Sequence, residues 1–112
     1  MTKIECILRP GKLEAVTDAL AKFGIRGMTA IEVIGCGMQK GHTQAEKGAG
    51  YNINLLPKTK IELVINDKYV DEVVRLITET SRTGEIGDGK IFVYPVGNAV
   101  RIRTGETGES AI

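Results

Sequence analysis

The fold is decided by two similar stretches of the chain, Lys3-Ile4-Glu5-Cys6-Ile7-Leu8 and Lys60-Ile61-Glu62-Leu63-Val64-Ile65. Both open with Lys-Ile-Glu and continue with apolar, partly β-branched residues, a composition typical of β-strands. A shift of about 57 residues superimposes one stretch on the other and reveals an internal repeat. The repeat predicts a domain made of two similar halves.

A helical pattern follows each stretch at the same shift. The aligned apolar positions are Leu13, Val16 and Leu20 in the first half and Val70, Val73 and Ile77 in the second. Spacings of three and four residues place such side chains on one face of a helix, so amphipathic helices are predicted over 11–23 and about 68–80. Gly24 and Gly27 are expected to end the first helix, and Gly84 the second.

Apolar runs at 28–36 and 91–96 predict a second strand in each half, so the element order is βαββαβ. Two such units most often form one antiparallel sheet with both helices on one face, the ferredoxin-like α+β arrangement. With 112 residues, the chain is expected to form a single domain over 1–112. Because the strands are apolar on both sides and the helices cover one face, further copies of the chain are expected to cover the other.

The composition limits the classes of partner. Fifteen basic and fourteen acidic residues nearly cancel, so no overall field draws the chain to nucleic acid or to an anionic membrane. Two Phe and three Tyr are too few for the base-stacking sheets of RNA-recognition proteins. Cys6 and Cys36 lack a Cys-x-x-Cys spacing, which argues against a zinc site or a disulfide scaffold. No apolar run has the length of a signal peptide or a membrane span. A soluble, cytoplasmic protein is expected.

A long polar segment, about 37–55, lies between the halves and is predicted to be a mobile, functional loop. At its base, Gly37-Met38-Gln39-Lys40-Gly41 offers backbone donors and a glutamine carbonyl that suit a carboxylate or a metal-bound anion; a polar hinge is the alternative. Lys58 is placed either to pair with the same anion or to be simply solvated. His42, the single histidine, has no second metal ligand at a suitable spacing and is expected at the surface.

Two further segments carry anion-binding chemistry. In Gly87-Asp88-Gly89-Lys90, glycine N–H groups beside a lysine suit a phosphate, and a tight turn ending in a solvated lysine is the alternative. In Arg101-Ile102-Arg103, two guanidiniums on one face of a strand suit phosphate oxygens, and cations guarding an exposed strand edge are the alternative.

Catalysis is not indicated by the sequence. It contains no nucleophile elbow, no Walker A motif and no distinctive carboxylate pair. An acylphosphatase-like hydrolase using Arg9 is the enzymatic alternative, but this arginine lacks a glycine-rich cradle.

Three segments taken together resemble the PII family of nitrogen-regulatory signalling proteins: Gly37–Thr43, Thr83–Val93 and Val100–Glu106. The resemblance implies a homotrimer that binds ATP or ADP in each cleft between subunits. It also implies a T-loop, at about 37–55, that docks into targets such as an ammonium transporter or nitrogen-assimilation enzymes and regulators. A C-terminal strand and tail would occupy about 98–112, and a membrane would be met only through a transporter. A specialised member that regulates nitrogenase is the alternative within the family.

The resemblance also assigns ligand contacts. The implied nucleotide contacts are Thr29, Glu62 and Val64 on the adenine or ribose side, Ile7, Gly35, Gly37 and Met38 in the cleft, Gly87, Asp88, Gly89 and Lys90 at the phosphates, and Arg101 and Arg103 across the subunit boundary. Gln39 would bind Mg²⁺, which bridges the ATP phosphates and 2-oxoglutarate. The implied 2-oxoglutarate contacts are Arg9, Gln39, Lys40, Gly41 and Lys58.

Two positions depart from the family pattern. Relatives often carry an arginine where this chain has Met38, so a cation that would touch the phosphates is missing, and an altered preference between ATP and ADP or a changed resting loop is expected. Tyr51 keeps the hydroxyl that some relatives have nucleotidylylated, although Lys47 and Gly50 change its surroundings. Tyr51 is therefore a candidate for this modification, whereas Ala49 excludes phosphorylation of a serine at its own position.

Overall fold

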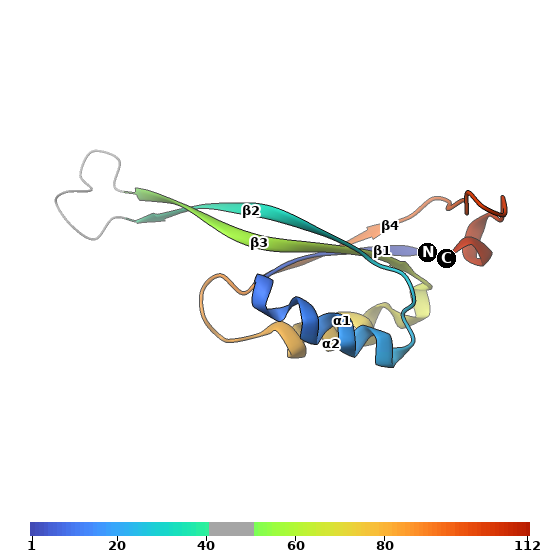
Figure 1. Ribbon diagram of the computed structural model, residues 1–112, viewed down its shortest axis with the longest axis horizontal. Helices are drawn as coiled ribbons and strands as arrows, with labels where there is room; N and C mark the ends of the chain where they lie inside the picture. Colours follow the sequence, from blue (N-terminus) through green and yellow to red (C-terminus); the bar gives the residue numbers. More distant parts are fainter. Residues whose placement is uncertain (41–50) are drawn as a thin grey trace.

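The computed structural model describes residues 1–40 and 51–112 (Figure 1). Its strands and α-helices are β1 (Thr2–Leu8), α1 (Leu13–Phe23), β2 (Thr29–Lys40), β3 (Tyr51–Ile65), α2 (Val70–Ser81) and β4 (Gly89–Pro95). Short 3-10 helices at Pro10–Lys12 and Asp67–Tyr69 lead into α1 and α2, and another lies at Gly108–Ala111. The predicted order βαββαβ is confirmed.

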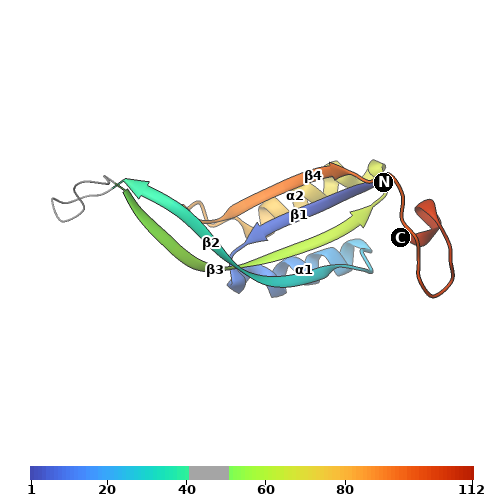
Figure 2. The same cartoon turned by 90° about the horizontal axis from the view of Figure 1, so that it is seen from above.

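The strands form one antiparallel sheet in the order β2-β3-β1-β4, and both helices lie on the same face of it (Figures 1 and 2). The two repeated stretches are the central strands β1 and β3, which pair with each other from Thr2 opposite Ile65 to Leu8 opposite Thr59. This arrangement confirms the predicted ferredoxin-like fold. Among the described residues, no helix has the length and apolar content needed to cross a bilayer.

The core lies between the sheet and the helices. Burial alternates along β1, so that every second side chain points toward the helices. The fully or nearly fully buried side chains are Ile4, Cys6, Leu8, Val16, Leu20, Ile61, Leu63, Ile65, Val73 and Ile77. They include four of the six apolar positions that the repeat aligned on the two helices, and the other two, Leu13 and Val70, are partly buried against this core. Each such side chain contributes roughly 1.5–3 kcal/mol through burial.

The two helices end differently. Gly24 adopts the left-handed conformation, with φ 112°, and its N–H donates to the carbonyls of Leu20 and Ala21, as expected for a glycine that ends a helix. The expectation for Gly84 is wrong, because α2 already ends at Ser81 and the next residue, Arg82, is extended. Gly84 takes its positive φ, 89°, farther along, inside the loop that leads to β4.

The sheet face opposite the helices mixes aromatic and charged side chains. Strand register places Lys3 beside Tyr94 and Glu5 beside both Phe92 and Glu62 on this face. The Tyr94 hydroxyl donates to Glu5 Oε2 at 3.3 Å, and the Lys3 ammonium lies 4.7 Å from the Tyr94 ring centre. Phe92 and Tyr94 are 43% and 40% exposed. The predicted apolar content of the second face is therefore confirmed for β4 but is diluted by charges on β1 and β3.

Both ends of the segment predicted as a loop at 37–55 are strands in the structure. Backbone pairing of β2 with β3 continues to Lys40 opposite Tyr51, so both ends of the predicted loop belong to strands. Such pairing satisfies backbone N–H and C=O groups whatever the side chains are, so a polar, glycine-containing sequence does not end the ladder. The β2–β3 hairpin extends beyond the helices (Figures 1 and 2). The predictions for Gly41, His42, Lys47, Ala49 and Gly50 fall outside the described residues.

The two cysteines differ in reactivity because they differ in burial. Burial raises the pKa of the Cys6 thiol to about 11, whereas Cys36 is exposed on β2. Since the thiolate is the reactive form, we expect native protein at pH 8 to be alkylated by iodoacetamide at Cys36 and not at Cys6. Peptide mass spectrometry measures this, with labelling in denaturant as the control in which both sites react. Rapid labelling of Cys6 in the folded protein would contradict the packed core.

Candidate functional site

The loop between α2 and β4 is built around two glycines with positive φ, 102° at Gly87 and 106° at Gly89. Gly89 also packs directly on β1, because a Cβ atom on it would lie 1.7 Å from the Ile7 carbonyl oxygen. At Gly87, a Cβ atom would come within 3.4 Å of Lys58 Nζ and 3.5 Å of an Arg9 terminal nitrogen. Backbone conformation and close packing thus both require glycine at Gly89, and both restrict Gly87.

Asp88 turns its carboxylate onto its own loop. It accepts hydrogen bonds from the N–H groups of Thr83 and Gly84, each at 2.9 Å, from the Thr83 hydroxyl, and from Arg9 Nε at 3.0 Å. These donors, led by the Thr83 hydroxyl, hold the pKa of Asp88 well below its ordinary value. Asp88 is therefore ionised at neutral pH and organises the loop. The family resemblance had implied a different role for it, a contact to the nucleotide phosphates.

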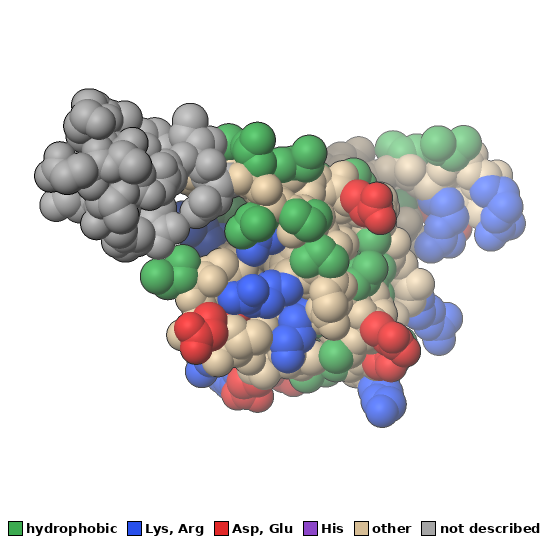
Figure 3. Space-filling view, turned by 60° about the vertical axis from the view of Figure 1, so that its left-hand side comes forward, with side chains coloured by type: hydrophobic (Ala, Val, Ile, Leu, Met, Phe, Trp, Pro, Cys, Tyr) green, Lys and Arg blue, Asp and Glu red, His purple; other side chains and the backbone are tan. Residues whose placement is uncertain are grey.

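Two cations from different elements meet at this loop. Arg9, which follows β1, donates through a terminal nitrogen to the Ile86 carbonyl at 2.9 Å, and Lys58 on β3 donates to the Gly87 carbonyl. The structure thus brings Arg9 and Lys58 to the predicted phosphate loop. Figure 3, which turns the hairpin end toward the viewer, shows basic side chains gathered below hydrophobic ones at the root of the hairpin. With two cations around one carboxylate, this end of the sheet suits an anion.

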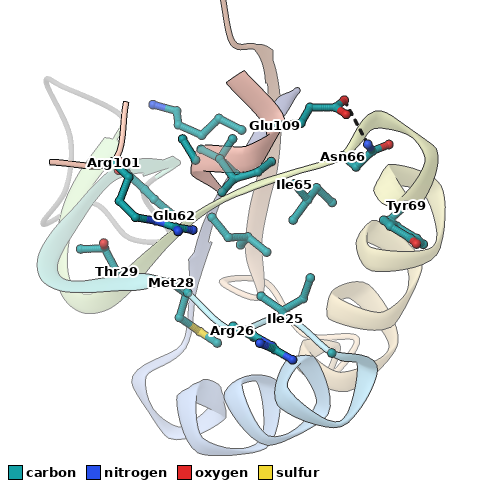
Figure 4. A pocket seen from close by; sticks show the side chains of 17 residues that line it. Ile25, Arg26, Met28, Thr29, Glu62, Ile65, Asn66, Tyr69, Arg101 and Glu109 are labelled. Carbon is teal, nitrogen blue, oxygen red and sulfur yellow. Dashed lines mark hydrogen bonds between the residues drawn. The ribbon is translucent and has the colours of Figure 1, made fainter. Parts of the chain in front are cut away.

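A second cluster lies at the opposite end of the sheet, around a pocket of about 920 Å³ (Figure 4). The loop before β2, the end of β3 and the C-terminal segment form its walls. Thr29, Glu62, Val64 and Arg101, all predicted as nucleotide contacts, line this pocket together. Sequence reasoning missed Arg26, Asn66 and Tyr69, which also line it, because no local motif marks them.

The C-terminal segment is not the predicted strand. Its extended pairing is limited to one bridge between Val100 and Thr107, with a turn between them. Within this turn Arg101 donates from its backbone to the Glu106 carbonyl at 2.9 Å and from its guanidinium to the Glu106 carboxylate at 3.0 Å. Gly105, with φ 74°, lets the chain reverse, so an extended strand cannot continue here. Arg101 and Arg103 consequently do not share one face of a strand.

The two clusters are separated by the length of the sheet. β4 joins the loop that ends at Gly89 to the C-terminal segment, and its seven residues span roughly 20 Å at about 3.4 Å per residue. On β2, Thr29 lies at the pocket end of the strand, whereas Gly35 and Gly37 lie farther along it, toward the hairpin. Figure 1 shows the loop before β4 at the hairpin end of the sheet and the C-terminal segment at the other. Within one chain, the predicted phosphate loop and Arg101 therefore do not face a common cleft.

Several predicted contacts lie where their side chains are not described. Met38, Gln39 and Lys40 are placed as β2 backbone, and Tyr51 opens β3, but their side chains lie outside the described part of the structure. Gly41 lies outside it altogether. The roles given to these residues stay predictions.

Gly89 offers a test of the loop. An alanine there combines a positive φ with a Cβ atom against the Ile7 carbonyl, so Gly89→Ala should lower the free energy of unfolding by roughly 2–4 kcal/mol. Gly97→Ala is the matched control, because a Cβ atom at Gly97 meets nothing within 4 Å. Urea unfolding followed by circular dichroism measures both. Equal stability of the two variants would show that β4 does not approach β1 in this way.

Known proteins resemble this chain over its whole length. The family model described as "Nitrogen regulatory protein P-II" matches residues 1–106. A nitrogen regulatory protein P-II of Pasteurella multocida is 54% identical over 112 residues, which cover 100% of both chains. A solved B. subtilis GlnK–ATP complex matches with a TM-score of 0.86 and 38% identity, covering 99% of this chain and 94% of that one. Arabidopsis thaliana PII bound to citrate matches with a TM-score of 0.80 and 42% identity, covering 99% and 91%. The chain belongs to the nitrogen regulatory protein P-II family.

Proposed function

We propose that this protein is a cytoplasmic homotrimer that binds ATP or ADP in clefts shared by neighbouring copies, binds 2-oxoglutarate beside the nucleotide, and signals through its T-loop. The observation that carries the proposal is the separation of two complementary half-sites. A phosphate-type loop lies at one end of the sheet, and a pocket with Thr29, Glu62 and Arg101 lies at the other. A second copy would bring the two ends together, and the aromatic and charged sheet face gives it a surface to pack against.

The phosphate half-site consists of the Gly87–Gly89 backbone and the Lys90 ammonium. Glycines with positive φ expose N–H groups to an anion, and a neighbouring lysine adds charge. Arg101 and Arg103 of a second copy would complete the phosphate contacts, since guanidinium groups suit phosphate oxygens. B. subtilis GlnK, which is similar to this chain, has been solved with ATP, and this supports nucleotide as the ligand.

The ribose and adenine half-site is the pocket at the other end of the sheet. Thr29 and Glu62 are directly opposite each other on β2 and β3, which sets a hydroxyl and a carboxylate side by side. Both groups suit the hydroxyls of a ribose, and Val64, farther along β3, offers an apolar contact for a base. Figure 4 shows Arg101 and Glu62 on the same side of this pocket.

A dicarboxylate would bind at the hairpin end, where Lys58 supplies an ammonium beside the loop. Lys40 and Gly41 would add backbone donors, and Gln39 would contribute an oxygen ligand to Mg²⁺. In the described residues, no group of three His, Cys, Asp or Glu side chains could hold a metal ion by itself. A single protein oxygen completed by phosphate oxygens and waters is the usual way in which Mg²⁺ is held beside a nucleotide, so this donor set fits. The ion would neutralise the charge between the phosphates and the dicarboxylate.

Signalling would follow from the position of the site at the root of the hairpin. β2 carries Gly35 and Gly37 and continues into the T-loop, so ligands at the root can favour one loop conformation over another. An ammonium transporter or a nitrogen-assimilation enzyme is the proposed target, and nitrogenase is the alternative. The relatives are named as regulatory proteins. Arg9, the basis of the acylphosphatase alternative, is paired with Asp88, which favours regulation over catalysis.

Calorimetry tests ligand coupling. We expect 2-oxoglutarate to release binding heat when titrated into protein with MgATP and none when ADP replaces it, because the dicarboxylate would need the positive charge of a Mg²⁺ ion that Gln39 and the ATP phosphates would hold. Absence of heat in both titrations would reject the sensing mechanism.

Nucleotide titrations of the wild-type chain and Met38→Arg belong to the same experiment. Equal ATP-to-ADP affinity ratios in the two would show that Met38 does not set nucleotide preference.

Mixed assemblies test the shared cleft. Lys90→Ala and Arg101→Ala should each weaken ADP binding strongly when pure, because each damages every cleft. After co-refolding in equal amounts, about one quarter of the clefts should combine an intact loop with an intact Arg101 and bind with wild-type affinity. Titration with a fluorescent nucleotide counts these tight sites. Each variant refolded alone by the same procedure is the control. No recovery of tight sites would mean that both residues act within one chain.

A further inference from the structure

The open face, which is the sheet face opposite the helices, carries charges that one chain matches only in part. Glu5 lies beside Glu62 on β3 and beside Phe92 on β4, and two neighbouring carboxylates repel each other. Glu62 is paired with the Lys60 ammonium at 3.6 Å. Glu5 forms no ion pair within the described part of the chain, and its hydrogen-bond donor is the neutral hydroxyl of Tyr94, at 3.3 Å. The centre of the open face therefore has an excess of negative charge at Glu5.

Lys3 supplies the opposite charge on the same face. It precedes Glu5 by two residues on β1, so both side chains point to the open face roughly 7 Å apart along the strand. Its ammonium lies 4.7 Å from the centre of the Tyr94 ring and has no carboxylate partner among the described residues. Partial burial, followed by the charges of Glu5 and Glu62, raises the pKa of Tyr94, so its hydroxyl keeps the proton that it donates. Tyr94 thus contacts both charges and keeps them apart.

A protein that covered the open face would remove water from these charges. Phe92 and Tyr94 are 43% and 40% exposed, so packing on them buries aromatic surface. The same packing would bury Glu5, which lies beside both rings. Burial of a carboxylate is costly unless a cation pairs with it, and a neutral hydroxyl does not supply that charge. The covering protein must therefore bring a cation to Glu5 and, for the same reason, an anion to Lys3.

We propose that the covering protein is a second copy of this chain, and that Glu5 of one copy pairs with Lys3 of the next. A second copy carries one of each charge that the first copy leaves unmatched, so the open face is complementary to itself. A contact between two different patches is head-to-tail, and its repetition can close a ring. The inference rests on the proposed function, since it concerns the homotrimer named there, and it adds the residues by which the copies recognise one another.

The other lysines of the central sheet have partners or tasks elsewhere. Lys60 is already paired with Glu62. Lys58 and Lys90 lie at the hairpin end, beside the loop that is proposed to bind anions. Among the lysines of β1, β3 and β4, this leaves Lys3, at the opposite end of β1, for the carboxylate of a second copy.

Pairing of charges between copies makes the assembly selective. Burial of an ion pair contributes little net free energy, so the pair would strengthen the pure assembly only modestly. A related chain with other residues at positions 3 and 5 would place like charges, or one buried charge without a partner, in the contact. Both arrangements are unfavourable, so the charges on the open face would exclude foreign copies.

A charge exchange tests this selection. Lys3→Glu/Glu5→Lys should assemble with itself, because each contact keeps a pair of opposite sign. Mixed with the wild type, it sets like charges against each other, so mixed trimers should fall from about three quarters, the value for random mixing, to less than about one tenth. Native mass spectrometry of co-refolded chains that differ in mass counts them. Arg75→Glu/Glu79→Arg, an exchange of exposed charges on α2, is the matched control and should mix randomly with the wild type.

Conservative variants provide a second readout. Glu5→Gln leaves Lys3 of the next copy buried without a partner, so it should raise the concentration at which the trimer dissociates about tenfold. Adding Lys3→Met to Glu5→Gln should reverse most of that loss, because both members of the pair are then neutral. Mass photometry over a dilution series measures dissociation, and circular dichroism checks that each variant folds.

The outcomes separate this inference from the proposed function. A trimeric wild type that mixed randomly with the charge-exchanged variant would overturn the pairing and leave the homotrimer in place. Equal dissociation of Glu5→Gln and Lys3→Met/Glu5→Gln would also overturn the pairing. A wild type that stayed monomeric would overturn the homotrimer of the proposed function and the pairing with it.

Discussion

The antiparallel pairing of β1 with β3 is the constraint on which the rest of the molecule depends. It joins the two repeated stretches edge to edge as neighbouring strands, with Ile4 opposite Leu63 and Cys6 opposite Ile61. Because side chains alternate along a strand, this register sends the apolar set to the helices and the mixed set, which includes Lys3, Glu5 and Glu62, to the open face. A slip of one residue would exchange the two faces and expose the core.

The same pairing places the chemistry of the site. Arg9 leaves the end of β1 and Lys58 lies on β3 just beyond Thr59, the last partner of β1, so the two cations arrive at the loop before β4 from adjacent strands. Gly89, the first residue of β4, can approach the Ile7 carbonyl closely because it carries no side chain. The loop geometry is thus a consequence of the sheet, and Asp88 stabilises it from within.

The proposed link between ligand binding and signalling depends on the long β2–β3 hairpin. Its paired backbone continues past the helices to Lys40 and Tyr51. A two-stranded ribbon without a covering layer has little side-chain packing to fix its position. In the proposed function, ligands at its root would therefore shift its conformation at modest free-energy cost.

The sequence by itself determined the element order and most of the core, and it marked the candidate anion-binding segments. Apolar periodicity and the repeat are local properties, so they identified β1, α1 and the buried positions Val16, Leu20, Val73 and Ile77 without any structure. Only the tertiary structure decided that Asp88 faces its own loop, that Arg101 turns onto Glu106 instead of lying on a strand, and that the two half-sites lie at opposite ends of the sheet. These features depend on contacts between residues far apart in the chain or on the reversal of a turn, and neither leaves a periodic signal in the sequence.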